Sequence, residues 1–156
     1  MHGRRVRNAA AAGLFAMACA GIMAGAPAPA PAQETTSSVV DGVYSVAQAA
    51  RGAELFQQSC AACHGAALTG LGEAPALVGA QFIGDFNGLT VGDLFERIRT
   101  TMPLNNPGSL TRDAYAGVLA FVLKSNGYRA GQRDLYSRTE FLNTMRFEPP
   151  AAAAAN

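Results

Sequence analysis

Two thiols and one imidazole stand together in the segment Cys60-Ala61-Ala62-Cys63-His64, which has the pattern C-x-x-C-H. On a helical turn, positions i, i+3 and i+4 lie on one face, so both sulfur atoms and the ring would point to the same side. This pattern is the attachment signature of c-type haem. It predicts one covalently bound haem, held by Cys60 and Cys63, with His64 as a ligand of its iron.

Other chemistry of the same motif finds less support in the rest of the sequence. A structural zinc site needs four ligands, and the only further cysteine and histidine, Cys19 and His2, lie near the N-terminus. A thioredoxin-like redox pair requires a strand–helix–strand context, which the sequence does not show. A plain disulfide between the two thiols is chemically allowed in an oxidising compartment, but it would leave His64 without a role.

The sixth ligand of the iron must come from elsewhere in the chain, and methionine is a common partner of histidine on haem iron. After the N-terminal 32 residues, the methionines are Met102 and Met145. Met102 ends a predicted helix and precedes Pro103, which fixes the backbone there, so we expect Met102 to bind the iron. Met145 lies in an amphipathic stretch, where methionine usually fills a core. An open position or a Lys124 ligand is the remaining alternative.

Residues 1–32 have the features of a secretory signal peptide. Arginines at positions 4, 5 and 7 precede an apolar stretch over residues 9–26, and Ala30 and Ala32 supply small residues before a cleavage site at Gln33. A membrane-spanning anchor fits less well, because the run is short and broken by glycine. Cys19 weakly resembles a lipoprotein cleavage site, whose use would tether the chain to a membrane. We expect an exported, periplasmic protein.

The charge balance and composition exclude some functions. The chain has 12 Lys+Arg and 11 Asp+Glu; removing the leader leaves nine basic and eleven acidic residues, a net charge of −2. We therefore expect no nucleic-acid partner. No second histidine follows the leader to form a Ser–His arrangement, and no paired carboxylates stand out, so the sequence does not indicate an enzyme.

Capping signals predict helices. Ser45, Thr90 and Thr111 are N-cap residue types and would begin helices over residues 46–59, 91–100 and 112–126. Ser45 with Gln48 would form a capping box. A second box at residues 137 and 140 would begin a short last helix that runs through residue 145.

The stretch between the motif and the second helix, residues 65–88, is rich in glycine and proline and is predicted to be a loop. Its many apolar side chains must cover something apolar. We expect an all-α domain over residues 46–147, preceded by a lead-in segment at 33–45 and followed by a disordered tail at 148–156. A domain this small needs stabilisation beyond its own core, which a covalently bound haem would provide.

Four segments together resemble the class I c-type cytochrome family: the C-x-x-C-H motif, residues 73–79 (EAPALVG), Thr101-Met102-Pro103, and residues 115–127. The resemblance covers about residues 47–127. It implies a small cytochrome c-like fold of three to five helices wrapped around one haem. It also implies that the first and last core helices cross, with Gly52 on the first helix allowing a close approach.

The resemblance further assigns roles around the haem. It implies that the carbonyl of Pro75 accepts a hydrogen bond from His64 Nδ1, and that Leu77, Phe82 and Phe86 pack on the porphyrin. The family usually has Gly-Pro-x-Leu where this chain has Ala-Pro-Ala-Leu at residues 74–77. A loop-stiffening proline and ordinary core residues are the alternative interpretations.

Residues 87–103 are similar to monohaem cytochromes that accompany periplasmic quinoprotein dehydrogenases. The resemblance implies a carrier of single electrons from a dehydrogenase donor to an oxidase or another cytochrome, with Arg97 and Arg99 as candidate partners of the haem propionates. If both axial positions are filled, the iron offers no place for a substrate. Two alternatives stay open: a haem enzyme or sensor of peroxide or gas with a labile Met102, and a fixed subunit of a dehydrogenase or oxidase complex.

Overall fold

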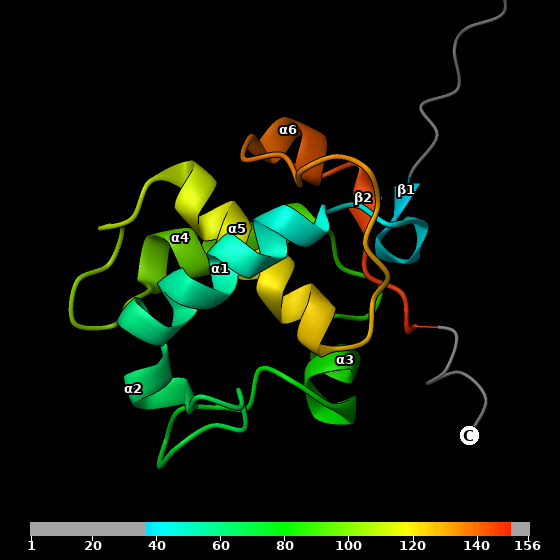
Figure 1. The fold of residues 1–156 in the computed structure, drawn as a ribbon. Coiled ribbons are helices and arrows are strands. Elements are labelled where there is room, and N and C mark those ends of the chain that lie inside the picture. The colour runs from blue at the N-terminus through cyan, green and yellow to red at the C-terminus, as the bar shows by residue number, and fades with distance from the viewer. Residues whose placement is uncertain (1–36, 151–156) are drawn as a thin grey trace, which may run out of the picture. The chain divides into compact units, whose positions relative to one another are not determined.

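The computed structural model describes residues 37–150, and these form an all-α fold with very little strand (Figure 1). The predicted signal peptide, Cys19 and residues 151–156 lie outside the described residues. The elements in chain order are β1 (Ser37–Ser38), the 3-10 helix η1 (Val39–Asp41), α1 (Val46–Ser59), α2 (Ala61–His64), α3 (Ala80–Phe86), α4 (Val91–Thr101), α5 (Arg112–Ser125), α6 (Thr139–Leu142) and β2 (Met145–Arg146).

The three longest helices begin at the N-cap residues that the sequence predicts. The side-chain oxygens of Ser45, Thr90 and Thr111 each accept a hydrogen bond from the backbone N–H three residues on, at 3.0, 3.0 and 3.2 Å. Each bond satisfies a donor that has no partner inside its helix. The ends of α1, α4 and α5 agree with the prediction to within one residue.

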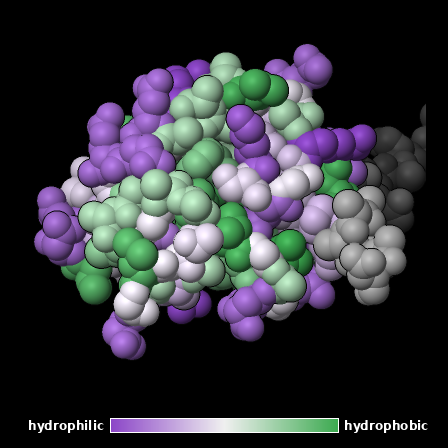
Figure 2. All heavy atoms as spheres, turned by 60° about the horizontal axis from the view of Figure 1, so that its bottom comes forward, coloured by the Kyte–Doolittle hydropathy of each residue, from purple (hydrophilic) through white to green (hydrophobic). Residues whose placement is uncertain are grey.

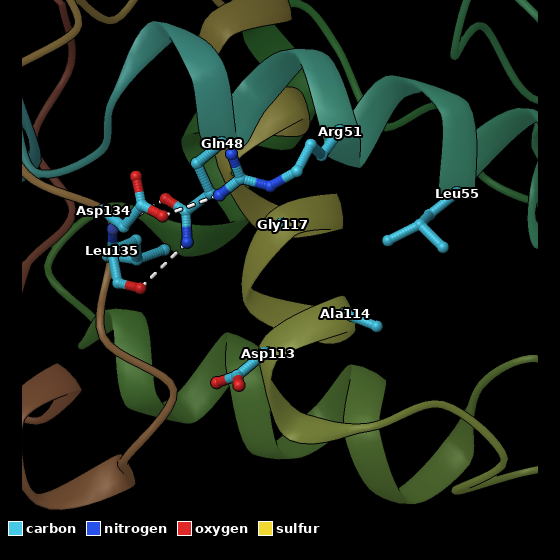
Figure 3. A pocket seen from close by; sticks show the side chains of 8 residues that line it. All are labelled: Gln48, Arg51, Leu55, Asp113, Ala114, Gly117, Asp134 and Leu135. Atoms are coloured by element: carbon cyan, nitrogen blue, oxygen red, sulfur yellow. Dashed lines mark hydrogen bonds and ion pairs between the residues drawn. The ribbon is translucent and has the colours of Figure 1, made fainter.

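The predicted capping box at the start of α1 is only half formed. Gln48 is 5% exposed, and its side-chain amide must therefore find partners inside the protein. It finds them on Leu135: Nε2 donates to the Leu135 carbonyl at 2.9 Å, and the Leu135 N–H donates to Oε1 at 2.6 Å (Figure 3). The side chain thus joins α1 to the segment after α5 instead of capping its own helix.

Two predictions about local structure are wrong. The stretch at 65–88 is not loop throughout, because it contains α3. The predicted last helix has no capping box at residues 137 and 140, because the N-cap of α6 is Arg138 and no side chain caps it. It also does not run through Met145, because α6 ends at Leu142 and Met145 lies in β2. The N–H of Ser37 donates to the Thr144 carbonyl at 3.0 Å, and β1 pairs in parallel with β2. The backbone after Leu142 therefore bonds to the lead-in segment instead of continuing a helix.

The crossing of α1 and α5 is the main packing contact of the fold (Figure 1). A Cβ atom built on Gly52 would lie 1.8 Å from the carbonyl oxygen of Gly117, so only glycine fits at this position. Beside the crossing, the fully buried ring of Phe56 packs on Phe121 with 5.4 Å between centroids. The crossing fixes the direction of α1, whose last turn leads into the C-x-x-C-H motif.

The chain after α5 packs along the domain. Its apolar side chains at Leu135, Leu142, Met145 and Phe147 are all buried in the common core. Tyr128 OH donates to the Glu148 carbonyl at 2.9 Å, which holds the first residue of the predicted tail. None of the helices within residues 37–150 has the length and apolar character that crossing a membrane requires.

Candidate haem site

The C-x-x-C-H motif lies where α1 gives way to α2. The N–H of Cys60 completes α1 by donating to the Phe56 carbonyl at 2.8 Å, and the Cys60 carbonyl accepts from His64 N–H at 3.0 Å. The helical turn expected from the motif is therefore present. Cys60 is half-buried, Cys63 is exposed, and neither is in a disulfide, so both thiols are available to form bonds with a haem.

The imidazole of His64 is buried and held in one orientation. It is 9% exposed, and its Nδ1 lies 2.9 Å from the carbonyl oxygen of Pro75. Because a carbonyl can only accept, Nδ1 must carry the hydrogen. In the neutral ring the lone pair is then on Nε2, which has no hydrogen-bond partner among residues 37–150. This is the tautomer that binds a metal through Nε2, with the carbonyl fixing the ring.

The loop that brings Pro75 to His64 closes tightly around Gly70. The N–H of Gly70 donates to the His64 carbonyl at 2.8 Å. Its backbone has φ +78°, and an added Cβ would lie 2.5 Å from the carbonyl oxygen of Ala74 and 2.9 Å from the carbonyl carbon of Pro75. Gly70 therefore both adopts a conformation that favours glycine and leaves the room in which the Pro75 segment lies.

Asn126, at the C-terminal end of α5, holds the other side of the same loop. Its Oδ1 accepts from Gly79 N–H at 3.0 Å, and its Nδ2 donates to the carbonyls of Leu77 and Val122, each at 2.9 Å. Sequence reasoning treated Asn126 only as the last residue of a helix. Its partners lie 47 and 49 residues away, and no local pattern indicates such a contact.

The three residues predicted to pack on the porphyrin, Leu77, Phe82 and Phe86, do not share one environment. Leu77 is half-buried next to the Asn126 contact. Phe82 is 3% exposed and packs against Phe86 and Phe147, with centroids 4.9 and 6.5 Å apart. Phe82 thus belongs to an aromatic cluster that joins α3 to the chain after β2.

Met102 and Met145 lie in very different places. Met102 is half-buried at the C-cap of α4, and its carbonyl accepts a hydrogen bond from Tyr115 OH at 2.6 Å. Met145 is 7% exposed within the core and is part of β2. Met102 and His64, the two candidate ligands of the iron, lie on separate segments. Within residues 37–150, no hydrogen bond links these two segments directly.

Comparison with known proteins agrees with this arrangement of donors. Residues 47–122 match the family described as "Cytochrome C oxidase, cbb3-type, subunit III". The matched residues form a c-type cytochrome domain. The cofactor of this family is a covalently bound haem c with iron, and the free thiols and the Nε2 lone pair provide the donors that it needs.

Among solved structures, the chain is similar to a chain in the crystal structure of the sulfane dehydrogenase SoxCD from Paracoccus pantotrophus. The sequence identity is 22%, the match covers 86% of this chain and 72% of that chain, and the TM-score is 0.46. No curated protein gives a significant match.

The thiol of Cys60 is poorly suited to dithiol redox chemistry. Burial, with a smaller effect of Cys63, raises the pKa of the Cys60 thiol, whereas reactive thiols have lowered pKa values. Groups of three or more Cys, His, Asp or Glu side chains able to hold a metal ion are absent from residues 37–150. The zinc alternative therefore lacks a set of ligands in this part of the chain.

One of the two arginines considered for the haem propionates is already paired. Arg99 binds Glu96 at 2.5 Å, and Glu96 also accepts hydrogen bonds from Arg112 and Thr139. The hydrogen bond from Arg99, followed by that from Thr139, lowers the pKa of Glu96 to about 2. Arg97 is exposed and makes no ion pair within the described residues.

Figure 2 shows the face of the cytochrome on which α2, the following loop and α3 lie. Hydrophobic residues gather across the middle of this face, and hydrophilic residues lie around much of its edge. A hollow of about 480 Å³ lies elsewhere, between α1, α5 and the segment at 134–135. Its lining includes the ion pair of Arg51 with Asp134 (Figure 3). It contains none of the motif residues, so it is separate from the candidate haem site.

Proposed function

We propose that this cytochrome is a periplasmic monohaem electron carrier whose iron lies between His64 and Met102. The observation that carries the proposal is the contact of 2.9 Å between the Pro75 carbonyl and Nδ1 of His64, a residue on the same turn as the two free thiols. This contact directs one nitrogen lone pair of a buried ring away from the loop, which is what a permanent axial ligand requires.

Each residue of the site has a separate task in the proposal. Cys60 and Cys63 anchor the haem by two thioether bonds, His64 supplies one axial nitrogen, and Met102 supplies the other ligand. When bound, the haem supplies an Fe(III)/Fe(II) couple that gains or loses one electron. The protein tunes that couple through the two ligands, through the hydrogen bond to Pro75 and through burial of the ring.

The proposed role as a carrier follows from ligand occupancy. With one position taken by His64 and the other by Met102, no site is left for a substrate, so electrons pass between whole proteins. We propose other redox proteins as the partners, with a dehydrogenase as donor and an oxidase or a second cytochrome as acceptor.

The test compares two variants that change a methionine in the same way, Met102→Leu and Met145→Leu, in protein exported from cells with its haem attached. The near-infrared band of a methionine–iron bond should be present in the oxidised wild type and in Met145→Leu, and absent in Met102→Leu. Loss of the histidine–methionine pair should also lower the reduction potential. A wild type without the band, or a band that survives in Met102→Leu, would overturn this ligand assignment.

The proposed location has its own test. Export predicts that the mature protein begins at Gln33, which N-terminal sequencing and intact mass can show. A mature protein that begins at a lipid-modified Cys19 would instead make it a tethered carrier. A protein that keeps residues 1–32 would contradict the proposed signal peptide.

A second candidate role is that of a fixed subunit in a larger oxidase or dehydrogenase. It is favoured by the description of the matching family, which names a subunit of an oxidase. Purification from native membranes and from the soluble periplasmic fraction separates the two roles. A free carrier should elute alone at the size of its own mass, whereas a subunit should elute with its partners at a fixed ratio.

A further inference from the structure

A single hydroxyl group holds both ends of the segment that carries Met102. Residues 102–110 join α4 to α5, and residues 104–109 within this segment are exposed. Tyr115, on the first turn of α5, is 2% exposed. Its OH donates to the Met102 carbonyl at 2.6 Å and accepts from Leu110 N–H at 3.4 Å. The start and the end of the segment are therefore bound to the same atom.

Few other polar contacts restrain this segment. Three backbone bonds lie within the segment itself: from Gly108 N–H to the Met102 carbonyl at 3.3 Å, from Asn106 N–H to the Pro103 carbonyl, and from Ser109 N–H to the Asn106 carbonyl. The Met102 N–H continues α4 by donating to the Ile98 carbonyl at 2.9 Å. Among the described residues, Tyr115 alone contributes a side-chain hydrogen bond to residues 102–110. Without its OH, the N–H of Leu110 has no partner.

We propose that Tyr115 is a positioning residue that keeps Met102 on the haem iron. The inference rests on the proposed role of Met102 as the sixth ligand. For an external ligand to replace Met102, the chain at the end of α4 must move away, and this movement breaks the bond between Tyr115 and the Met102 carbonyl. The apparent affinity for an external ligand is scaled by the population of the open state, so Tyr115 lowers that affinity.

The experiment uses the oxidised protein with its haem attached and imidazole as the external ligand. Tyr115→Phe keeps the buried ring and removes only the hydroxyl. Because a buried hydrogen bond has a modest net worth, apparent imidazole binding should become roughly three- to tenfold tighter. Tyr128→Phe is the matched control, since Tyr128 is also buried and donates to a backbone carbonyl, that of Glu148, away from Met102. It should change imidazole binding by less than about twofold.

A double-variant cycle tests whether Tyr115 acts through Met102. In Met102→Leu, where no methionine has to leave, adding Tyr115→Phe should leave imidazole binding unchanged. A further increase in affinity in that background would show that the hydroxyl has only a general structural role, and would overturn the proposal.

A second measurement needs no variant. If Met102 leaves the iron only when the Tyr115 contact opens, hydrogen exchange at the Leu110 amide should be faster in the imidazole-bound wild type than in the free wild type. Equal exchange in the two states would overturn the positioning role alone. So would equal imidazole binding by Tyr115→Phe and Tyr128→Phe, provided that the wild type shows the methionine–iron band. A wild type without that band would overturn the proposed ligand, and this inference with it.

Discussion

The glycine pair at the crossing of α1 and α5 allows a prediction in which the same substitution, glycine to alanine, has very different effects at two neighbouring sites. Gly52→Ala places a Cβ 1.8 Å from the carbonyl oxygen and 2.3 Å from the carbonyl carbon of Gly117. Both are backbone atoms and cannot rotate away. Gly117→Ala places a Cβ 3.6 Å from the nearest atom outside its own helix, the Cα of Gly52, which is ordinary van der Waals contact.

The magnitudes follow from these distances. To accept the Gly52→Ala methyl group, the helices must separate by about 1.6 Å, which loosens the packing around Phe56. Overpacking of a core typically costs about 1–3 kcal/mol, and we expect the upper end because backbone meets backbone. Gly117→Ala should range from neutral to about 1 kcal/mol more stable, because alanine is the better helix former.

The assay is urea unfolding of the haem-loaded protein, followed by far-ultraviolet circular dichroism, with thermal unfolding as a second measure. Gly52→Ala should lower the midpoint temperature by roughly 10 °C, and Gly117→Ala should leave it equal or higher. Equal destabilisation of the two variants, or a Gly52→Ala protein within about 1 kcal/mol of the wild type, would refute the close approach on which the reasoning depends.

Three further predictions concern side chains around the site. Glu96→Gln should lower the free energy of unfolding by only about 1 kcal/mol at pH 7, because solvent partly screens the contacts of Glu96. The pKa of Glu96 is lowered from 4.5 to about 2. In paired urea titrations, the difference in stability between wild type and variant should therefore be full above pH 4.5 and vanish as the pH falls through 2. Asn126→Ala should cost about 2–3 kcal/mol in the same assay, because Gly79 N–H and the Leu77 carbonyl lose their partner. Gly70→Ala should reduce the yield of haem-loaded protein far more than Gly72→Ala, since both positions have positive φ but only the Cβ at Gly70 would meet backbone within 4 Å.

The parts of the fold that sequence reasoning predicts well are those set by neighbours in the chain. Ser45, Thr90 and Thr111 bind the N–H three residues on, and such contacts depend on local sequence alone. The turn that holds Cys60, Cys63 and His64 is equally local. The contact between His64 and Pro75 spans 11 residues; it followed from the family resemblance and not from spacing.

Two of the predictions that failed are ones in which a distant segment competes for the same backbone or side chain. A helix through Met145 was consistent with local pattern, but the backbone at 144–146 bonds to residues 37–38 instead. Gln48 was expected to cap its own helix, yet it binds Leu135, 87 residues away. Tertiary contacts of this kind override local preference, and a single sequence contains no periodic signal for them.

The same long-range contacts explain how one helix sets the spacing of the whole site. Tyr115 on α5 holds the Met102 segment, and Asn126 at its C-terminal end holds the loop that carries Pro75. The two positions are about 16 Å apart along an α-helix, which is a stiff element. Between them, Gly117 meets Gly52 on the helix that leads to Cys60. The segments that bear the thiols, the partner of the imidazole and the methionine are thus all fixed to α5, so a shift at the crossing should disturb the proposed axial ligands before it unfolds the domain.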